Sequence, residues 1–194
     1  MKNLGLKMAV ASLSAVALAS IAIRAVRAHD DDDRPVRFSA NLSTFNEVVP
    51  KGTGAHGTYR AVLSKDGSTL NWTVTWTGLT GPPLFAHLHF AQAGVNGNVM
   101  TFICGGPNGN PDIPAKPACP QTTSGSISGT TTAADIIALN SGASDQGLDL
   151  HDFATFLKAV ARGDSYANMH TARFPGGEIR GQVAVHRGRD DDDR

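Results

Sequence analysis

The sequence predicts an all-β protein, a Greek-key β-sandwich that carries one helix. Three observations lead to this prediction. Apolar and polar residues alternate with a period of two in several short segments, which is the pattern of strands with one buried face. The 21 glycines and 10 prolines among 194 residues indicate many turns. Only one segment has helical spacing of its apolar residues, which favours a sandwich over an α/β fold.

The clearest strands form a predicted hairpin. Leu70, Trp72, Val74 and Trp76 share one face of a segment whose other positions are polar. A strand over 58–63 precedes it across a Lys-Asp-Gly-Ser turn. Further strands are expected over 37–49 (with a bulge), 84–90, 98–103, 166–171 and 178–185.

The predicted helix spans Asp149–Gly163. Its apolar residues recur at spacings of three and four, so that they line one face. Asp149 is the expected N-cap, and Gly163 is expected to end the helix. The helix therefore lies across one edge of the sandwich.

The N-terminus has the organisation of a secretory signal peptide. Two lysines precede an apolar run over Met8–Ile23, and cleavage is expected after Ala28, with an earlier site after Ala19 as an alternative. A retained membrane anchor is the other interpretation, although the run is short for a span. Cleavage predicts a secreted or periplasmic protein with no membrane attachment. It also moves the formal net charge from 0 to about −4, which excludes the basic character of a nucleic-acid binder.

Two runs of four aspartates flank the predicted domain. We assign 29–36 as an acidic disordered segment, 37–187 as the domain and 188–194 as an acidic tail, because adjacent carboxylates repel one another and stay solvated. A cation site formed by joining the two runs is the alternative. The runs lack the interleaved Asn and Gly of a calcium loop, so we do not adopt it.

The two cysteines, Cys104 and Cys119, are predicted to form a disulfide. Both lie in the exported part of the chain, where thiols become oxidised. A loop of this size stabilises a fold by about 3 kcal/mol. The alternative is that a thiolate binds a metal.

His87 and His89 are the most informative residues of the chain. They lie two apart in the strand over 84–90, so both project from the face opposite Leu84, Ala86, Leu88 and Phe90. Adjacent imidazoles can chelate a metal ion, and copper is the first candidate because divalent copper binds nitrogen sites most tightly. The alternative is a pair of partly exposed histidines that hydrogen-bond to neighbouring strands.

Two more histidines extend this candidate site. If Ala167 and Met169 face the core, Asn168 and His170 face the same side as the histidine pair, which makes His170 the third candidate ligand. His56 has the parity of the polar residues of its strand and is a weaker fourth candidate.

Other polar residues are expected to support the site. Asn168, Glu178 and Gln92 are candidate partners that hold the imidazole tautomers. Arg173 and Arg180 are either solvated strand residues or guides for anions.

Several of these segments resemble the CHRD domain, first described as a repeat in chordin and common in exported bacterial proteins. The resemblance lies in residues 42–50 with Glu47, 86–97, 102–106 and 161–182, and covers about 37–185. It implies an immunoglobulin-like β-sandwich, distantly similar to copper/zinc superoxide dismutases. By that analogy His87, His89 and His170 bind copper, and the disulfide of the dismutases has its counterpart here. The zinc loop of those enzymes is missing.

These observations predict an exported CHRD-domain protein that binds copper through a three-histidine site, in a carrier or redox role. The alternative is an extracellular interaction module without metal or enzymatic activity, which binds a protein partner. A superoxide-dismuting enzyme is a third interpretation. The sequence contains no nucleophile elbow, phosphate loop or nucleotide fingerprint, so hydrolase and nucleotide-dependent functions have no support.

Overall fold

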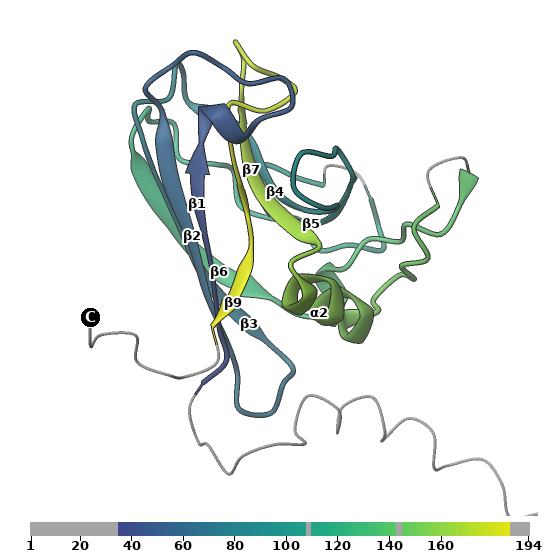
Figure 1. Cartoon of the computed structure of the whole chain (residues 1–194). Helices are drawn as coiled ribbons and strands as arrows, with labels where there is room; N and C mark the ends of the chain where they lie inside the picture. The colour runs from purple at the N-terminus through teal and green to yellow at the C-terminus, as the bar shows by residue number, and fades with distance from the viewer. Residues whose placement is uncertain (1–34, 108–109, 143–144, 187–194) are drawn as a thin grey trace, which may run out of the picture. The chain divides into compact units, whose positions relative to one another are not determined.

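Nine strands pair into one antiparallel sheet in the computed structural model of the chain (Figure 1), which describes residues 35–107, 110–142 and 145–186. The predicted signal peptide and both aspartate runs lie outside these residues. The strands are β1 (Arg37–Ser43), β2 (His56–Leu63), β3 (Leu70–Thr77), β4 (Pro83–Phe90), β5 (Asn98–Cys104), β6 (Gly125–Thr131), β7 (Ser165–Thr171), β8 (Ile179–Gln182) and β9 (Ala184–His186). The helical elements are α2 (Phe153–Arg162) and two 3₁₀ turns, η1 (Thr44–Asn46) and η2 (Ala133–Asp135).

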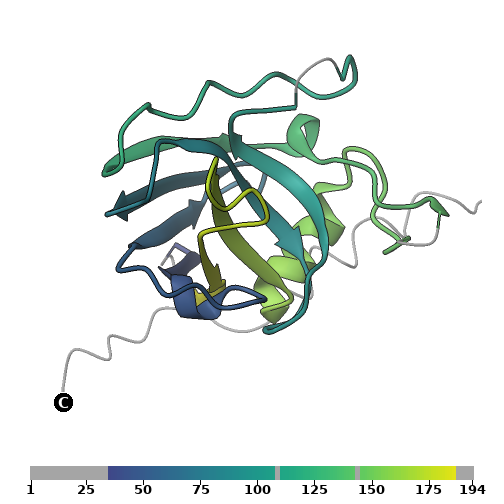
Figure 2. The same cartoon turned by 90° about the horizontal axis from the view of Figure 1, so that it is seen from above.

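The strand order is β5-β4-β7-β8-β1-β2-β3-β6, and β9 pairs with β1. The sheet curls until it is nearly barrel-shaped, as the view from above shows (Figure 2). The all-β prediction is confirmed, with the strands joined in one continuous hydrogen-bonded sheet. The order also places β4 beside β7, two strands that are far apart in the sequence.

The predicted hairpin is confirmed as β2 and β3. Its register pairs His56 with Thr77 and Leu63 with Leu70, and residues along β3 alternate between buried and exposed. Trp72 and Trp76 face the core with exposed fractions of 4% and 1%. Each indole N–H still finds an acceptor, Thr131 Oγ1 and the Thr122 carbonyl respectively.

Two predicted strands have different ends in the structure. The opening strand stops at Ser43, because the Ser43 hydroxyl accepts a hydrogen bond from Phe45 N and starts the turn η1. The closing strand is divided at Val183, whose N–H donates to the Ser165 carbonyl at 2.8 Å. After this residue, β9 pairs with β1 instead of continuing the pairing of β8 with β7.

The helix begins later than predicted. Asp152 is the N-cap, and its carboxylate accepts a hydrogen bond from Thr155 N at 2.9 Å. The helix cannot include His151, which has a φ of 63°. Asp149 instead accepts a hydrogen bond from the side chain of Asn140. Gly163 ends the helix in the left-handed conformation, as predicted.

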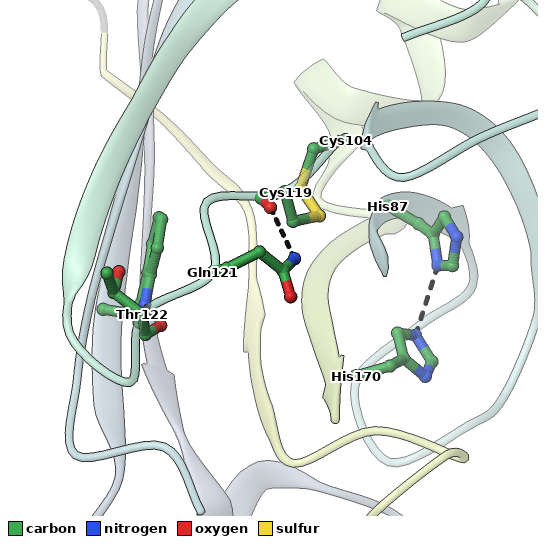
Figure 3. Close-up of a disulfide and its surroundings, with 7 residues drawn as sticks. His87, Cys104, Cys119, Gln121, Thr122 and His170 are labelled. Atoms are coloured by element: carbon green, nitrogen blue, oxygen red, sulfur yellow. Dashed lines mark hydrogen bonds between the residues drawn. A yellow bond between two sulfur atoms is a disulfide. The ribbon is translucent and has the colours of Figure 1, made fainter. Parts of the chain in front are cut away.

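The predicted disulfide between Cys104 and Cys119 is present (Figure 3). Because the two cysteines bind each other, the alternative of a thiolate metal ligand is wrong. Cys104 ends β5, and Cys119 lies in the loop that leads to β6. The bridge therefore ties one edge strand of the sheet to the segment that precedes the other. No helix within the described part of the chain has the length and apolarity to cross a membrane.

Candidate metal centre

The pairing of β4 with β7 brings three histidines together. His87 lies opposite Asn168 and His89 lies opposite Tyr166, so His170 is diagonal to His87 on the same face. Each of the three side chains offers a nitrogen, and these nitrogens all lie within 4.8 Å of one another. The face prediction therefore holds for all three histidines.

The histidines are more buried than the sequence suggested. The exposed fractions of His87, His89 and His170 are 7%, 8% and 8%. On the core side of β4, Ala86 and Leu88 are buried as predicted, at 0% and 1%.

Leu84 departs from the predicted pattern, because it is 42% exposed instead of buried. The pairing of β4 with β7 is irregular between Pro83 and Phe85, so Leu84 has no partner on β7.

The spacing of two ring nitrogens suits a shared ion. His87 Nδ1 lies 3.2 Å from His170 Nε2, and the two nitrogens point toward each other (Figure 3). Metal–imidazole bonds of about 2.0–2.1 Å in a tetrahedral site place neighbouring ligand atoms about 3.3 Å apart. The two histidines thus lie close to the separation that one ion would require.

Backbone carbonyls hold the other nitrogens of two rings. His89 Nδ1 donates to the Gly97 carbonyl, and His170 Nδ1 donates to the Pro175 carbonyl, both at 2.9 Å. These bonds leave the lone pair on Nε2 of each ring, which is the arrangement that orients metal-binding histidines. His89 Nε2 is buried and has no hydrogen-bond partner.

A stack of planar groups fixes the ring of His89. The ring lies parallel to that of Tyr166, with 4.5 Å between centroids and 3° between planes. The guanidinium of Arg180 lies 3.3 Å from the centroid of the same tyrosine ring, which places it on the opposite face. His87 in turn meets the ring of Phe102 edge-on at 4.5 Å. Sequence reasoning did not single out Tyr166 or Phe102 for the site.

Arg180 corrects the expectation of a solvated strand residue, because it is only 2% exposed. Its guanidinium donates to Asn96 Oδ1 at 3.0 Å and to the carbonyls of Val95 and Gln92 at 2.5 and 3.4 Å. Arg180 thereby holds the loop that ends at Gly97, whose carbonyl anchors His89. Arg173 is exposed, as predicted, and lies over the ring of Phe174.

Burial keeps the three imidazoles neutral. Desolvation lowers the pKa of His87 to about 2, with smaller contributions from the charges of His170 and His89. Desolvation likewise lowers the pKa of His89 to about 4, although the hydrogen bond to Gly97 opposes it. The pKa of His170 is lowered by desolvation as well. Near neutral pH no proton must leave before these nitrogens can bind a metal.

The structure does not bring His56 to this cluster. His56 is exposed at the start of β2, and its Nδ1 lies 3.1 Å from the Gly54 carbonyl. It shares the outer face of the sheet with the other three histidines. However, β1 and β8 lie between β2 and β7, and strands spaced about 4.8 Å apart separate His56 from β7 by about 14 Å.

Of the three predicted supporting residues, only Asn168 contacts a histidine. Its Oδ1 lies 3.1 Å from His170 Nε2. The buried Glu178 carboxylate accepts hydrogen bonds from Thr80 and Thr171 instead. Gln92 takes part through its carbonyl, which accepts from Arg180.

Glu47 lies in the first segment that resembles the CHRD domain. It is a buried carboxyl group close enough to Arg180 to feel its charge. It is 3% exposed, and desolvation raises its pKa to about 7 against the opposing charges of Arg180 and Lys51.

Comparison with known proteins places the chain in a family. The family model of the CHRD domain matches residues 38–183, which covers the whole sheet except one residue of β1 and the strand β9. No similar curated protein and no similar solved structure was found. CHRD domains occur in extracellular or periplasmic proteins. The match spans most of the chain and includes all three clustered histidines, so the chain belongs to the CHRD domain family.

Proposed function

We propose that this protein is an exported metal-binding protein that holds one copper ion through His87, His89 and His170. The observation that carries the proposal is a cluster of three buried, neutral imidazoles whose nitrogens lie within 4.8 Å of one another. Within this cluster His89 Nε2 has no hydrogen-bond partner. A buried polar atom without a partner costs about 1–3 kcal/mol, and a bound ion would remove that cost.

The contacts of the cluster favour metal binding over a purely structural role. In an interaction module without metal, the buried nitrogens would be expected to hydrogen-bond to protein groups. Here Nδ1 of His89 and Nδ1 of His170 do so, while the nitrogens that face the centre of the cluster are left to one another and to Asn168.

The donor atoms suggest which metal to test first. Imidazole suits copper and zinc, and divalent copper binds such sites more tightly than zinc does. Burial of all three rings favours a carrier that holds its ion over an enzyme that admits a substrate. The proposed location, outside the cytoplasm, rests on the signal peptide expected over 1–28 and on the occurrence of CHRD domains.

The proposal is tested by titrating the metal-free protein with Cu²⁺ and with Zn²⁺ against a competing chelator of known affinity. We expect one tightly bound Cu²⁺ per chain. His87→Ala, His89→Ala and His170→Ala should each weaken binding by on the order of 100-fold or more, since even removal of a supporting group costs about 10–100-fold. His56→Ala is the matched control and should bind like the wild type, because His56 lies outside the cluster.

Two results would overturn the proposal. One is the absence of stoichiometric binding at micromolar metal. The other is copper binding that persists unchanged in the triple histidine variant, which would place the ion elsewhere on the chain.

A further inference from the structure

We infer that the side-chain oxygen of Asn168 is a fourth ligand, so that the centre presents three imidazole nitrogens and one amide oxygen. This inference rests on the proposed function and deepens it. It assigns a role to a residue that a three-histidine site leaves out, and it limits the chemistry that the bound ion can support.

Asn168 occupies the middle of the cluster. It precedes His170 by two residues on β7, so both side chains project from the same face. It is also directly opposite His87 in the pairing of β7 with β4. The side chain is 3% exposed and therefore is turned to the cluster and away from solvent.

The contact between Asn168 and His170 joins two acceptors. His170 Nδ1 gives its hydrogen to the Pro175 carbonyl, so Nε2 carries a lone pair. Asn168 Oδ1, which is also an acceptor, lies 3.1 Å from that nitrogen. Two lone pairs at this distance repel each other, whereas a cation bound to both atoms makes the arrangement favourable.

Two distances agree with the separation of ligand atoms in one coordination shell. His170 Nε2 has Asn168 Oδ1 at 3.1 Å and His87 Nδ1 at 3.2 Å. Ligand atoms of a tetrahedral ion are about 3.3 Å apart when each bond is about 2.0–2.1 Å. His89 Nε2, the buried nitrogen without a partner, supplies the fourth corner.

A four-ligand shell of this kind has two chemical consequences. It closes the position that a catalytic metal leaves open for water or substrate, as structural zinc sites do. It also contains no thiolate or thioether, the ligands that select monovalent copper, and an amide oxygen suits a divalent ion better. The centre is therefore assigned to storage or transport of a divalent ion.

A rival explanation is that the amide turns by half a rotation and donates its N–H to His170 Nε2, which would make Asn168 a positioning residue only. Two variants separate these roles. Asn168→Leu keeps the approximate volume and removes the oxygen, and Asn168→Asp places a charged oxygen at the same point. Asn71→Leu, at an exposed position on β3, is the matched control.

The experiment measures Cu²⁺ affinity together with the electron paramagnetic resonance spectrum of the bound copper in normal and ¹⁷O-enriched water. The wild type should show no line broadening from ¹⁷O, because no water binds the ion. Asn168→Leu should bind about 10–100-fold more weakly and show broadening, because water takes the vacated position. Asn168→Asp should bind more tightly and change the copper hyperfine splitting, whereas Asn71→Leu should match the wild type.

The outcomes distinguish this inference from the proposed function. If wild-type protein binds copper and Asn168→Leu does so with unchanged affinity or without bound water, Asn168 is not a ligand and the three-histidine proposal stands. If the wild type binds no copper, the proposed function fails first. Should Asn168→Leu fail to fold, an unchanged affinity and spectrum of Asn168→Asp would overturn the inference by itself.

Discussion

At the scale of single residues, burial of the histidines makes folding depend on pH. Desolvation lowers the pKa of His87 to about 2 and that of His89 to about 4, and it lowers the pKa of His170 as well. The unfolded chain binds protons at these residues below about pH 6.5, whereas the folded chain binds them only at lower pH. Their contribution to stability is therefore complete above pH 6.5 and is lost as the pH falls.

Glu47 acts in the opposite direction. Its pKa rises to about 7 on folding, so its contribution is lost as the pH rises from about 4.5 to 7. Three histidines outweigh one glutamate. The free energy of unfolding of the metal-free protein should fall by roughly 2 kcal/mol for each unit by which the pH is lowered around pH 5.

Urea denaturation between pH 4.5 and 7 measures this slope. His87→Leu should reduce the slope by about 1.4 kcal/mol per pH unit, which is the contribution of one proton. A stability that stays constant or increases on acidification would contradict the burial of the three imidazoles.

The buried hydroxyl of Tyr59 lowers the stability of the fold. Tyr59 is fully buried, and its hydroxyl has no hydrogen-bond partner. Tyr59→Phe should therefore raise the free energy of unfolding by about 1 kcal/mol, because the variant removes a desolvated group that gains nothing in return. Thermal and urea unfolding test this expectation. Tyr166→Phe is the informative comparison and should not stabilise, since the Tyr166 hydroxyl accepts a hydrogen bond from Gly97 N.

At the scale of elements, the start of helix α2 distinguishes two aspartates. Asp152 caps the helix through Thr155 N, whereas the Asp149 carboxylate accepts a hydrogen bond from the exposed side chain of Asn140 and caps no helix N–H. Asp152→Ala should lower the free energy of unfolding by about 1 kcal/mol, and Asp149→Ala should lower it by less. Urea denaturation measures both effects. Equal losses in the two variants would contradict the assignment of Asp152, rather than Asp149, as the N-cap.

Strands with one apolar and one polar face were predictable from the sequence. The alternation of β3 identified its buried face, and the same parity placed His87 and His89 together, with His170 on the matching side of β7. Strand β6 was not predicted, because Ile127 is its only large apolar residue and the strand forms through backbone pairing with β3.

The alternation of apolar and polar residues could not predict the order of the strands in the sheet or which loops cover its outer face. His56 has the correct parity, yet two strands separate its strand from β7. Arg180 also has the parity of a solvated residue, yet the loop before Gly97 folds over it and supplies its acceptors. Parity reports which face a residue occupies, whereas burial depends on which distant segment covers that face.

At the scale of the whole domain, the loop between β5 and β6 links the two edges of the sheet. The disulfide fixes Cys119 to the end of β5, and Gly105 N donates to the Pro117 carbonyl at 2.9 Å. Lys116 forms an ion pair with Asp135 at 2.7 Å and donates to a carbonyl of β6. The loop thus restrains β5, the neighbour of the strand that carries His87 and His89.

The double variant Cys104→Ala/Cys119→Ala tests what this restraint contributes. Loss of a bridge with a sequence separation of 15 should lower the free energy of unfolding by about 3 kcal/mol. Copper affinity at a temperature where the variant is folded should stay within about threefold of the wild type, because β4 remains paired with β7 and Cys104 packs in the core opposite Ala86. Urea denaturation measures the first effect and chelator competition the second. A large loss of copper affinity in folded variant would instead mean that closure of the sheet edges holds the histidines in place, which would make the centre sensitive to reduction of the disulfide.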